Sequence, residues 1–329
     1  MIFINFKKYF IKLLLILTFI IPTTTLAYTN KVILGGETIG IEVNSKGVMV
    51  VGFYEVNNCY IAKDAGFKLG DTIIKINSQT INSIDDMVNV VSHSKEETIT
   101  FDVLRDNKRH QIKLKLVKTK EGIIKTGLYT KDTINGIGTL SYINPETKTF
   151  SSLAHMIIDS KTNKKFEIKG GKIYNAEVTS IKKSKVGEAG EKNAIYSKDS
   201  IIGEIKDNKT TGIYGTYTSN INNKEIIEVA KKEEVTTGEA TIKTVIKDNI
   251  IETFSINIVK INENSVSKNI FFKITDPKLL KETGGVVQGM SGSPIIQNNK
   301  LVGAVNYVVL NDPTKGYGIF IESMLEEET

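Results

Sequence analysis

The sequence has few of the residues that several kinds of chemistry need. It contains one cysteine, Cys59, so no disulfide can form within the chain, and this residue is expected to be buried or half-buried rather than reactive. The three histidines, His93, His110 and His155, are far apart and form no paired-His metal motif. No metal and no cofactor are therefore expected.

Excess charge, repeats and long amphipathic stretches are also scarce. Outside the N-terminal leader the chain carries 40 basic and 37 acidic residues, which is too balanced to indicate a nucleic-acid partner. No internal repeat and no low-complexity block is present. The sequence therefore excludes a nucleic-acid-binding or repeat protein and points to folded domains.

The N-terminus has the pattern of an export signal. Lys7, Lys8 and Lys12 precede an apolar run at 13–21, Pro22 ends that run, and Ala27 closes a small-residue cleavage site. The apolar core is short for a membrane span, which needs about 20 residues. Residues 1–27 are thus predicted to be a signal peptide or, if uncleaved, a membrane anchor.

A Gly-flanked serine lies at 289–294, in the sequence Gly-Met-Ser-Gly-Ser-Pro, directly before an apolar run. Such a turn can expose the Ser291 hydroxyl and direct the N–H groups of Gly289 and Ser291 at one point, as a nucleophile with an oxyanion hole requires. The segment resembles the Gly-Asp-Ser-Gly-Gly-Pro motif of chymotrypsin-like serine proteases, with Met290 and Ser293 as substitutions. The alternative is a hairpin turn without a catalytic role.

A nucleophilic serine needs a base, and His155 is the candidate. His93 and His110 fall in a separate N-terminal module and are expected at its surface. His155 lies among small and apolar residues, and it precedes Ser291 as the base does in the chymotrypsin chain order.

Two longer segments carry a more specific resemblance. Residues 136–147 with 153–155, and residues 283–297, resemble the stage IV sporulation protein B (SpoIVB) family of serine peptidases. The resemblance implies an enzyme that is exported from the forespore and cleaves a membrane-bound regulator of sigma-factor processing. It places the nucleophile at Ser291 and the base at His155, although Ala154 stands where the family usually has Gly.

The same resemblance implies a role for Asp276 as the third catalytic residue. Asp276 lies only 15 residues before Ser291, whereas the orienting Asp usually falls further upstream. Asp159 and Asp199 are the alternatives. A structural role for Asp276, capping a short helix after Pro277, is the other interpretation.

Residues 28–118 are predicted to form a PDZ domain. Thr38, Ile39, Gly40 and Ile41 resemble the carboxylate-binding loop, which would bind a peptide C-terminus through backbone N–H groups. A helix over 85–92, capped by Ser83 or Asp85, would flank the groove. Asp106 and Asn107 are predicted to form a hairpin turn.

Residues 119–329 are strand-rich, and short apolar runs separated by polar turns predict a chymotrypsin-like double β-barrel. The whole chain is therefore predicted to be mainly β: a PDZ domain followed by a serine protease domain. The expected partners are a protein or peptide substrate, with self-association through the PDZ domain as a second option. The expected location is the forespore membrane or intermembrane space, anchored or released. The alternative function is a non-catalytic PDZ scaffold with a degenerate protease domain.

Overall fold

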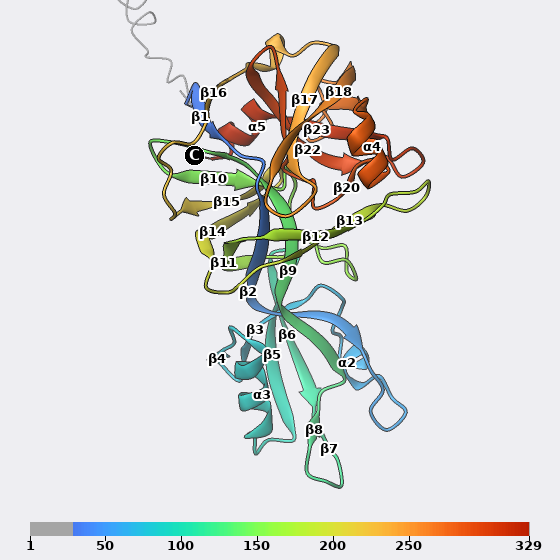
Figure 1. Cartoon of the computed structure of the whole chain (residues 1–329). Coiled ribbons are helices and arrows are strands. Elements are labelled where there is room, and N and C mark those ends of the chain that lie inside the picture. Colours follow the sequence, from blue (N-terminus) through green and yellow to red (C-terminus); the bar gives the residue numbers. More distant parts are fainter. Residues whose placement is uncertain (1–28, 329) are drawn as a thin grey trace, which may run out of the picture.

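The computed structural model describes residues 29–328, and the chain is mainly β (Figure 1). The predicted leader at 1–27 lies outside the described residues. Within 29–328, no helix is long and apolar enough to cross a membrane. The fold class predicted from the sequence, a PDZ domain with a protease domain, is confirmed.

Most of the elements are strands, and the helices are short. The strands are β1 (Lys31–Leu34), β2 (Thr38–Phe53), β3 (Thr72–Ile76), β4 (Gln79–Thr80), β5 (Thr98–Arg105), β6 (Lys108–Lys115), β7 (Val117–Lys118), β8 (Ile124–Lys125), β9 (Leu128–Ile143), β10 (Thr149–Ser152), β11 (Ile168–Asn175), β12 (Glu177–Lys182), β13 (Gly190–Ile195), β14 (Ile201–Lys209), β15 (Gly212–Tyr217), β16 (Ile226–Val229), β17 (Gly238–Val245), β18 (Ile251–Ile261), β19 (Ile270–Ile274), β20 (Val287–Gln288), β21 (Pro294–Gln297), β22 (Lys300–Val308) and β23 (Lys315–Phe320). The helices are α2 (Ile61–Asp64), α3 (Ile84–Ser92), the 3-10 turn η1 (Lys232–Glu234), α4 (Pro277–Thr283) and α5 (Ile321–Glu326).

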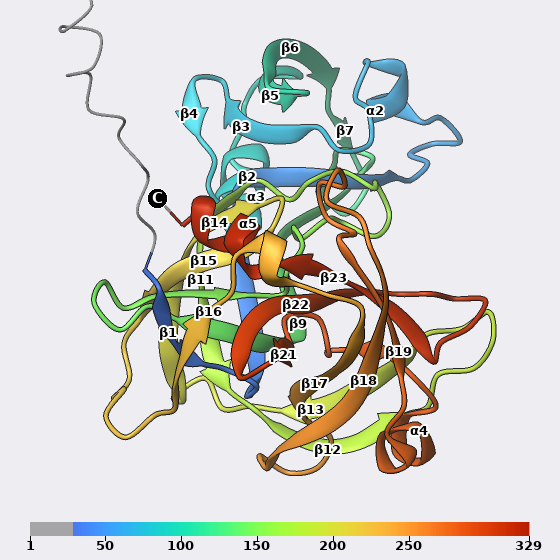
Figure 2. The ribbon, with the colours of Figure 1, turned by 90° about the horizontal axis from the view of Figure 1, so that it is seen from above.

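The strand pairings of the protease domain form two antiparallel barrels of six strands each. Figure 2 shows these strands from above. The first closes in the order β2, β11, β14, β15, β10, β9 and back to β2. The second closes in the order β17, β18, β19, β23, β22, β21 and back to β17. Each barrel surrounds its own apolar core, so closure leaves few exposed strand edges.

Two short strands join the barrels. β1 pairs with β9 of the first barrel on one side and with β16 on the other, and β16 pairs with β22 of the second barrel. A third apolar cluster, which includes Val32, Tyr142 and Leu301, fills the space between them. The N-terminal strand is therefore part of the junction that carries the site described below.

The PDZ domain has its own apolar core, and its helix cap and hairpin turn are where the sequence predicts them. Ser83 caps α3, accepting a hydrogen bond from the Asp86 amide in a capping box, so the predicted helix and cap are confirmed. Asp106 and Asn107 both have positive φ in the turn between β5 and β6, which confirms the hairpin. The buried side chains of this core include Phe67 and Phe101, which meet edge to face.

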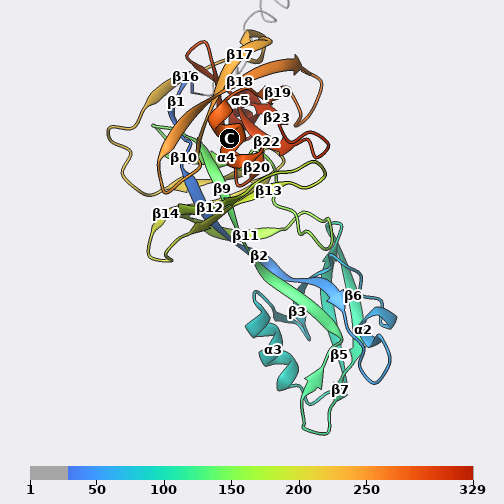
Figure 3. The same ribbon diagram turned by 45° about the vertical axis from the view of Figure 1, so that its right-hand side comes forward.

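The PDZ and protease domains share two long strands, β2 and β9, which run side by side from the barrel into the PDZ domain (Figure 3). Residues 39–44 of β2 pair with β9 on one edge and with β11 on the other. The predicted boundary at 118/119 therefore differs from the structure, in which the PDZ domain is inserted into the first barrel. β7 and β8, on either side of that boundary, pair as a hairpin.

The prediction of a carboxylate-binding loop at 38–41 is also wrong, because these residues belong to β2 of the first barrel. Thr38, Ile39, Gly40 and Ile41 are buried strand residues. Ile39, Gly40 and Ile41 are paired on both edges, and Thr38 is paired with β9. Ile39 and Ile41 pack in the core of the first barrel. No backbone N–H groups of a free loop are available there to bind a peptide carboxylate. Cys59, predicted to be buried or half-buried, is exposed.

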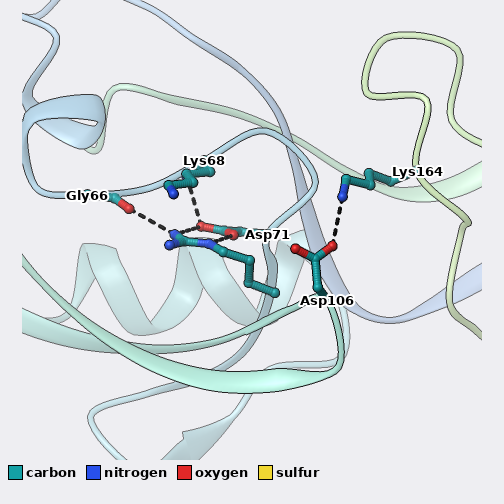
Figure 4. A network of polar contacts seen from close by, with 6 residues as sticks. Gly66, Lys68, Asp71, Asp106 and Lys164 are labelled. Carbon is teal, nitrogen blue, oxygen red and sulfur yellow. Dashed lines mark hydrogen bonds and ion pairs between the residues drawn. The ribbon is translucent and has the colours of Figure 1, made fainter.

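Polar contacts hold the PDZ domain against the protease domain (Figure 4). Lys164, in the loop after β10, lies 2.7 Å from Asp106 at the β5–β6 turn. Lys131 of β9 lies 2.6 Å from Asp159, whose side chain is fully buried. Behind Asp106, Arg105 bonds both oxygens of the buried Asp71 carboxylate at 2.7 Å, which stiffens the turn that meets Lys164.

Candidate active site

Ser291 lies in a tight turn between β20 and β21, at the inner end of the second barrel. The turn depends on two glycines in the left-handed region, Gly289 with φ 92° and Gly292 with φ 94°. A Cβ placed on Gly292 would lie 2.0 Å from the carbonyl oxygen of Thr139, so only glycine fits. The sequence Gly-Met-Ser-Gly therefore brings the serine turn into direct contact with β9 of the first barrel.

The backbone amides of this turn fall into two groups. Those of Met290, Gly292 and Ser293 donate to carbonyl oxygens within the fold. Those of Gly289 and Ser291 make no hydrogen bond to any residue within 29–328. Two free amides on alternate residues of one turn are the donor arrangement that an oxyanion needs.

His155 follows β10 of the first barrel and is held in a structured turn. Leu153 and Ala154 both have positive φ, at 69° and 58°, and Ala154 is fully buried. This backbone explains why glycine suits the position of Ala154, because side chains are disfavoured in the left-handed region. The half-buried imidazole stacks on the Tyr307 ring, with the centroids 5.5 Å apart.

The hydrogen bond of His155 defines its tautomer. Its Nδ1 lies 2.9 Å from the carbonyl oxygen of Met156. A carbonyl oxygen only accepts, so in the neutral ring Nδ1 carries the proton and Nε2 is free to accept one. Burial lowers the pKa of His155 below its ordinary value, although the bond to Met156 acts in the opposite direction. The imidazole is therefore neutral, and its basic nitrogen free, at neutral pH.

Neighbouring residues bring Ser291 and His155 to the same junction of the two barrels. Ser291 Oγ donates to the carbonyl oxygen of Asn306 at 3.1 Å, and Asn306 directly precedes Tyr307, on which His155 stacks. The Gly292 backbone also approaches that of Leu153. Within 29–328, no hydrogen bond joins the two side chains. Such bonds are often long in enzymes without substrate and tighten on binding.

Asp276 is the sequence-predicted residue that the structure does not bring to His155. It is the N-cap of α4, where its Oδ1 accepts from the Leu279 amide at 2.9 Å. The two alternatives also lie elsewhere: Asp159 pairs with Lys131, and Asp199 lies in an exposed turn at 197–200. The group that holds His155 is thus a backbone carbonyl, and the capping interpretation of Asp276 is the one that fits.

The capping geometry makes a prediction for Asp276. Asp276→Asn should keep both activity and stability near those of the wild type, because Asn caps as well as Asp. Asp276→Ala should lower the free energy of unfolding by about 1 kcal/mol with little change in turnover. Urea unfolding and single-turnover rates of both variants check this. A large loss of turnover in a folded Asp276→Asn variant would contradict the capping role.

The sequence did not single out four residues that shape this site. Asn306 and Tyr307 lie on β22. Lys268 lies over the rings of Tyr307 and Tyr317, at 5.4 and 5.2 Å from their centroids. Thr139 of β9 donates its N–H to the Ser291 carbonyl at 2.9 Å. Their proximity to Ser291 depends on barrel closure, which no local pattern reveals.

The PDZ domain has a groove of about 440 Å³ between α3 and the first residues of β9. Its lining includes Met87, Val88, Val91, Ile123 and Leu128. Over residues 128–134, β9 pairs with β2 on one edge only, so its other edge is open toward α3. An extended peptide can add to such an edge as a further strand.

Two six-stranded antiparallel barrels with a serine and a histidine at their junction define a chymotrypsin-like serine peptidase. The model of the SpoIVB peptidase S55 family matches residues 122–325, which is more than half of the sequence. The chain belongs to this family. A PDZ domain model matches residues 38–116.

Comparisons with whole proteins are weaker. No curated protein matches the chain. Among solved structures, the PDZ domain of the SdrC-like protein from Listeria monocytogenes is 20% identical, with 27% of this chain and 90% of that chain covered and a TM-score of 0.23. Rv3671c from M. tuberculosis H37Rv, an inactive serine-to-alanine variant, is 12% identical over 58% of this chain and 79% of that chain, with a TM-score of 0.27. Both scores are low, so the family rests on its model.

Proposed function

We propose that this chain is a sporulation signalling serine endopeptidase that cleaves a membrane-associated regulator of sigma-factor processing. The family supports the reaction class and the sporulation context. The observation that carries the catalytic assignment is the Ser291 turn, with two free amides beside the neutral His155. Export from the forespore, in an anchored or released form, is part of the same proposal and is motivated by the leader pattern.

In the proposed reaction, the Ser291 hydroxyl attacks the scissile carbonyl. Its Oγ first leaves the Asn306 carbonyl by rotation about χ1 and turns toward Nε2 of His155. His155 takes the proton from Oγ and later returns it to the leaving amine. The amides of Gly289 and Ser291 donate to the oxyanion of the tetrahedral intermediate, and one such donor is typically worth about 3 kcal/mol of transition-state stabilisation.

His155 is oriented here by the Met156 carbonyl rather than by a carboxylate. The hydrogen bond to that carbonyl fixes the tautomer and the ring direction, and Tyr307 supports one face of the ring. A neutral carbonyl stabilises the imidazolium less than a carboxylate does. We therefore expect slow turnover, which suits an enzyme that acts on one regulator and not on bulk protein.

The lowered pKa of His155 predicts the acid limb of the activity profile. The base works only when neutral, so activity rises with pH through the pKa of His155 and stays high above it. Burial lowers that pKa below the ordinary 6.5. The pH at which kcat/KM reaches half of its maximum should therefore lie below 6.5. A profile of kcat/KM from pH 4.5 to 8 checks this. A limb centred above pH 6.5 would contradict it.

We place peptide recognition by the PDZ domain in the groove between α3 and β9. Val88 lines this groove and is 57% exposed, so Val88→Arg should put a charge on the apolar floor and weaken peptide binding at least about tenfold. Binding is measured with the inactive full chain and a set of peptides that end in an apolar residue. Val186→Arg is the matched control, since Val186 is exposed on the β12–β13 turn away from the groove. Equal affinity in the two variants would argue against this groove.

Labelling of the full chain with a fluorophosphonate probe tests the proposed function directly. We expect one labelled residue, Ser291, identified by peptide mapping. No labelling under conditions in which the protein is folded would favour the non-catalytic scaffold. Fractionation of sporulating cells tests the location, and recovery in the mother-cell cytoplasm would contradict export from the forespore.

A further inference from the structure

Lys192 is a buried lysine without a carboxylate partner. It lies on β13 with 1% of its surface exposed. Its Nζ donates to Thr244 Oγ1 at 2.8 Å and approaches Thr38 Oγ1 at 3.4 Å. No ion pair within 29–328 includes it, and burial lowers the pKa of Lys192 to about 7. A buried amine is costly to maintain, and such groups gather at functional sites.

The lysine lies where both barrels and the serine turn meet. Thr38 belongs to β2 of the first barrel, and Thr244 belongs to β17 of the second. β13 itself pairs in parallel with β20, the strand that leads into the serine turn. A Cβ placed on Gly289 would lie 3.1 Å from Cβ and Cδ of Lys192. The methylene chain of Lys192 is therefore the floor under Gly289.

A chain of hydroxyl groups connects the amine to the other side of the turn. Ser293 Oγ donates to Thr244 Oγ1 at 3.0 Å and lies 3.4 Å from Thr139 Oγ1. Thr139 in turn donates its hydroxyl to the Gly289 carbonyl at 2.7 Å and its N–H to the Ser291 carbonyl. The two carbonyl groups of the turn thus point into this buried network. The amides of the same two residues make no hydrogen bond within 29–328.

Residue 290, which is Asp in the chymotrypsin-like motif, is an apolar residue in this chain. Met290 stands where the chymotrypsin-like motif has Asp, and it is fully buried, with Sδ near the Val287 amide. The turn therefore lacks an internal carboxylate to fix its orientation. Lys192 is the ionisable group that lies directly beneath it.

We propose that Lys192 is a positioning residue for the oxyanion hole. By packing under Gly289 and by bonding through Thr244 and Ser293, it holds the serine turn so that the amides of Gly289 and Ser291 face the substrate. This inference rests on the proposed peptidase function, since it assigns those two amides to the oxyanion. Lys192 does not touch the substrate, and its effect falls on transition-state stabilisation rather than on substrate binding.

The test compares variants of the full chain in a peptide cleavage assay. Lys192→Met keeps the stem and removes the amine, and we expect kcat to fall about 10- to 100-fold while KM stays within about twofold. The fluorophosphonate labelling rate should fall in parallel. Lys172→Met is the matched control, because Lys172 is an exposed strand lysine of the same domain. Wild-type kcat in folded Lys192→Met would overturn the proposal, as would a loss confined to KM.

If Lys192→Met does not fold, a second pair of variants tests the positioning role of Lys192. Thr244→Val removes the hydroxyl between Lys192 and Ser293, and Thr244→Ser restores it. We expect low kcat in the first and recovery in the second, and wild-type kcat in folded Thr244→Val would overturn the proposal. The failure of the proposed function is a separate outcome. It would appear as a wild-type chain that neither cleaves nor labels at Ser291.

Discussion

Ser291→Ala is expected to lower kcat/KM for peptide cleavage by about 10⁴-fold or more and to abolish fluorophosphonate labelling. The hydroxyl is the only part of the side chain that the change removes, and it makes one hydrogen bond, to the Asn306 carbonyl. Thermal unfolding should therefore remain near that of the wild type. The measurement is cleavage of a peptide substrate by the purified chain beside its unfolding midpoint.

Ser160→Ala is the control for the nucleophile. Ser160 is exposed on the loop that follows His155, so its loss should change neither activity nor stability. Ser293 does not serve as a control, because its buried hydroxyl bonds Thr244 beneath the serine turn. Cleavage at the wild-type rate by Ser291→Ala would remove the serine mechanism altogether.

His155→Ala is expected to cost as much as the loss of the nucleophile, again about 10⁴-fold or more in kcat/KM. The double variant with Ser291→Ala should be no slower than either single one, because residues that act as one unit are not additive. KM for a peptide should change little, since the proposed role of the imidazole is to move a proton. Steady-state kinetics of the three variants measure both quantities.

His110→Ala is the matched control for the base. His110 is exposed on β6 of the PDZ domain, so its replacement should leave the cleavage rate unchanged. Full activity in folded His155→Ala, or a further large loss in the double variant, would show that another group takes the proton from Ser291.

Features set by local chemistry were predictable from the sequence. Ser83 begins α3 because its hydroxyl accepts from an amide three residues on, which a short motif reveals. Asp106 and Asn107 form a hairpin turn because these residue types tolerate positive φ. The glycines around Ser291 follow the same logic. The spacing of short apolar runs between polar turns likewise indicated two antiparallel barrels.

Features set by contacts between distant segments were not predictable. Residues 38–41 were predicted to be a binding loop, but β11, more than 120 residues later in the chain, pairs with residues 39–41. Lys192 lies in a polar segment that reads as surface, and its burial arises only where two barrels meet. The partner of His155 is the Met156 carbonyl, a backbone group that every residue carries. Asp276 offered two roles that the sequence could not separate.

The strands shared by the two domains have a consequence for the order in which the chain acquires structure. As synthesis or translocation proceeds from the N-terminus, β1 and the first half of β2 emerge before their partners in β9, β11 and β16. The PDZ core lies almost wholly within residues 48–128, so it can form first from contacts of shorter sequence separation. The first barrel closes only after β15, at residues 212–217, has arrived. The serine turn at 289–294 belongs to the second barrel, which closes only after β23, at residues 315–320, has arrived. We therefore expect proteolytic activity to appear only after β23 has left the ribosome or the export channel.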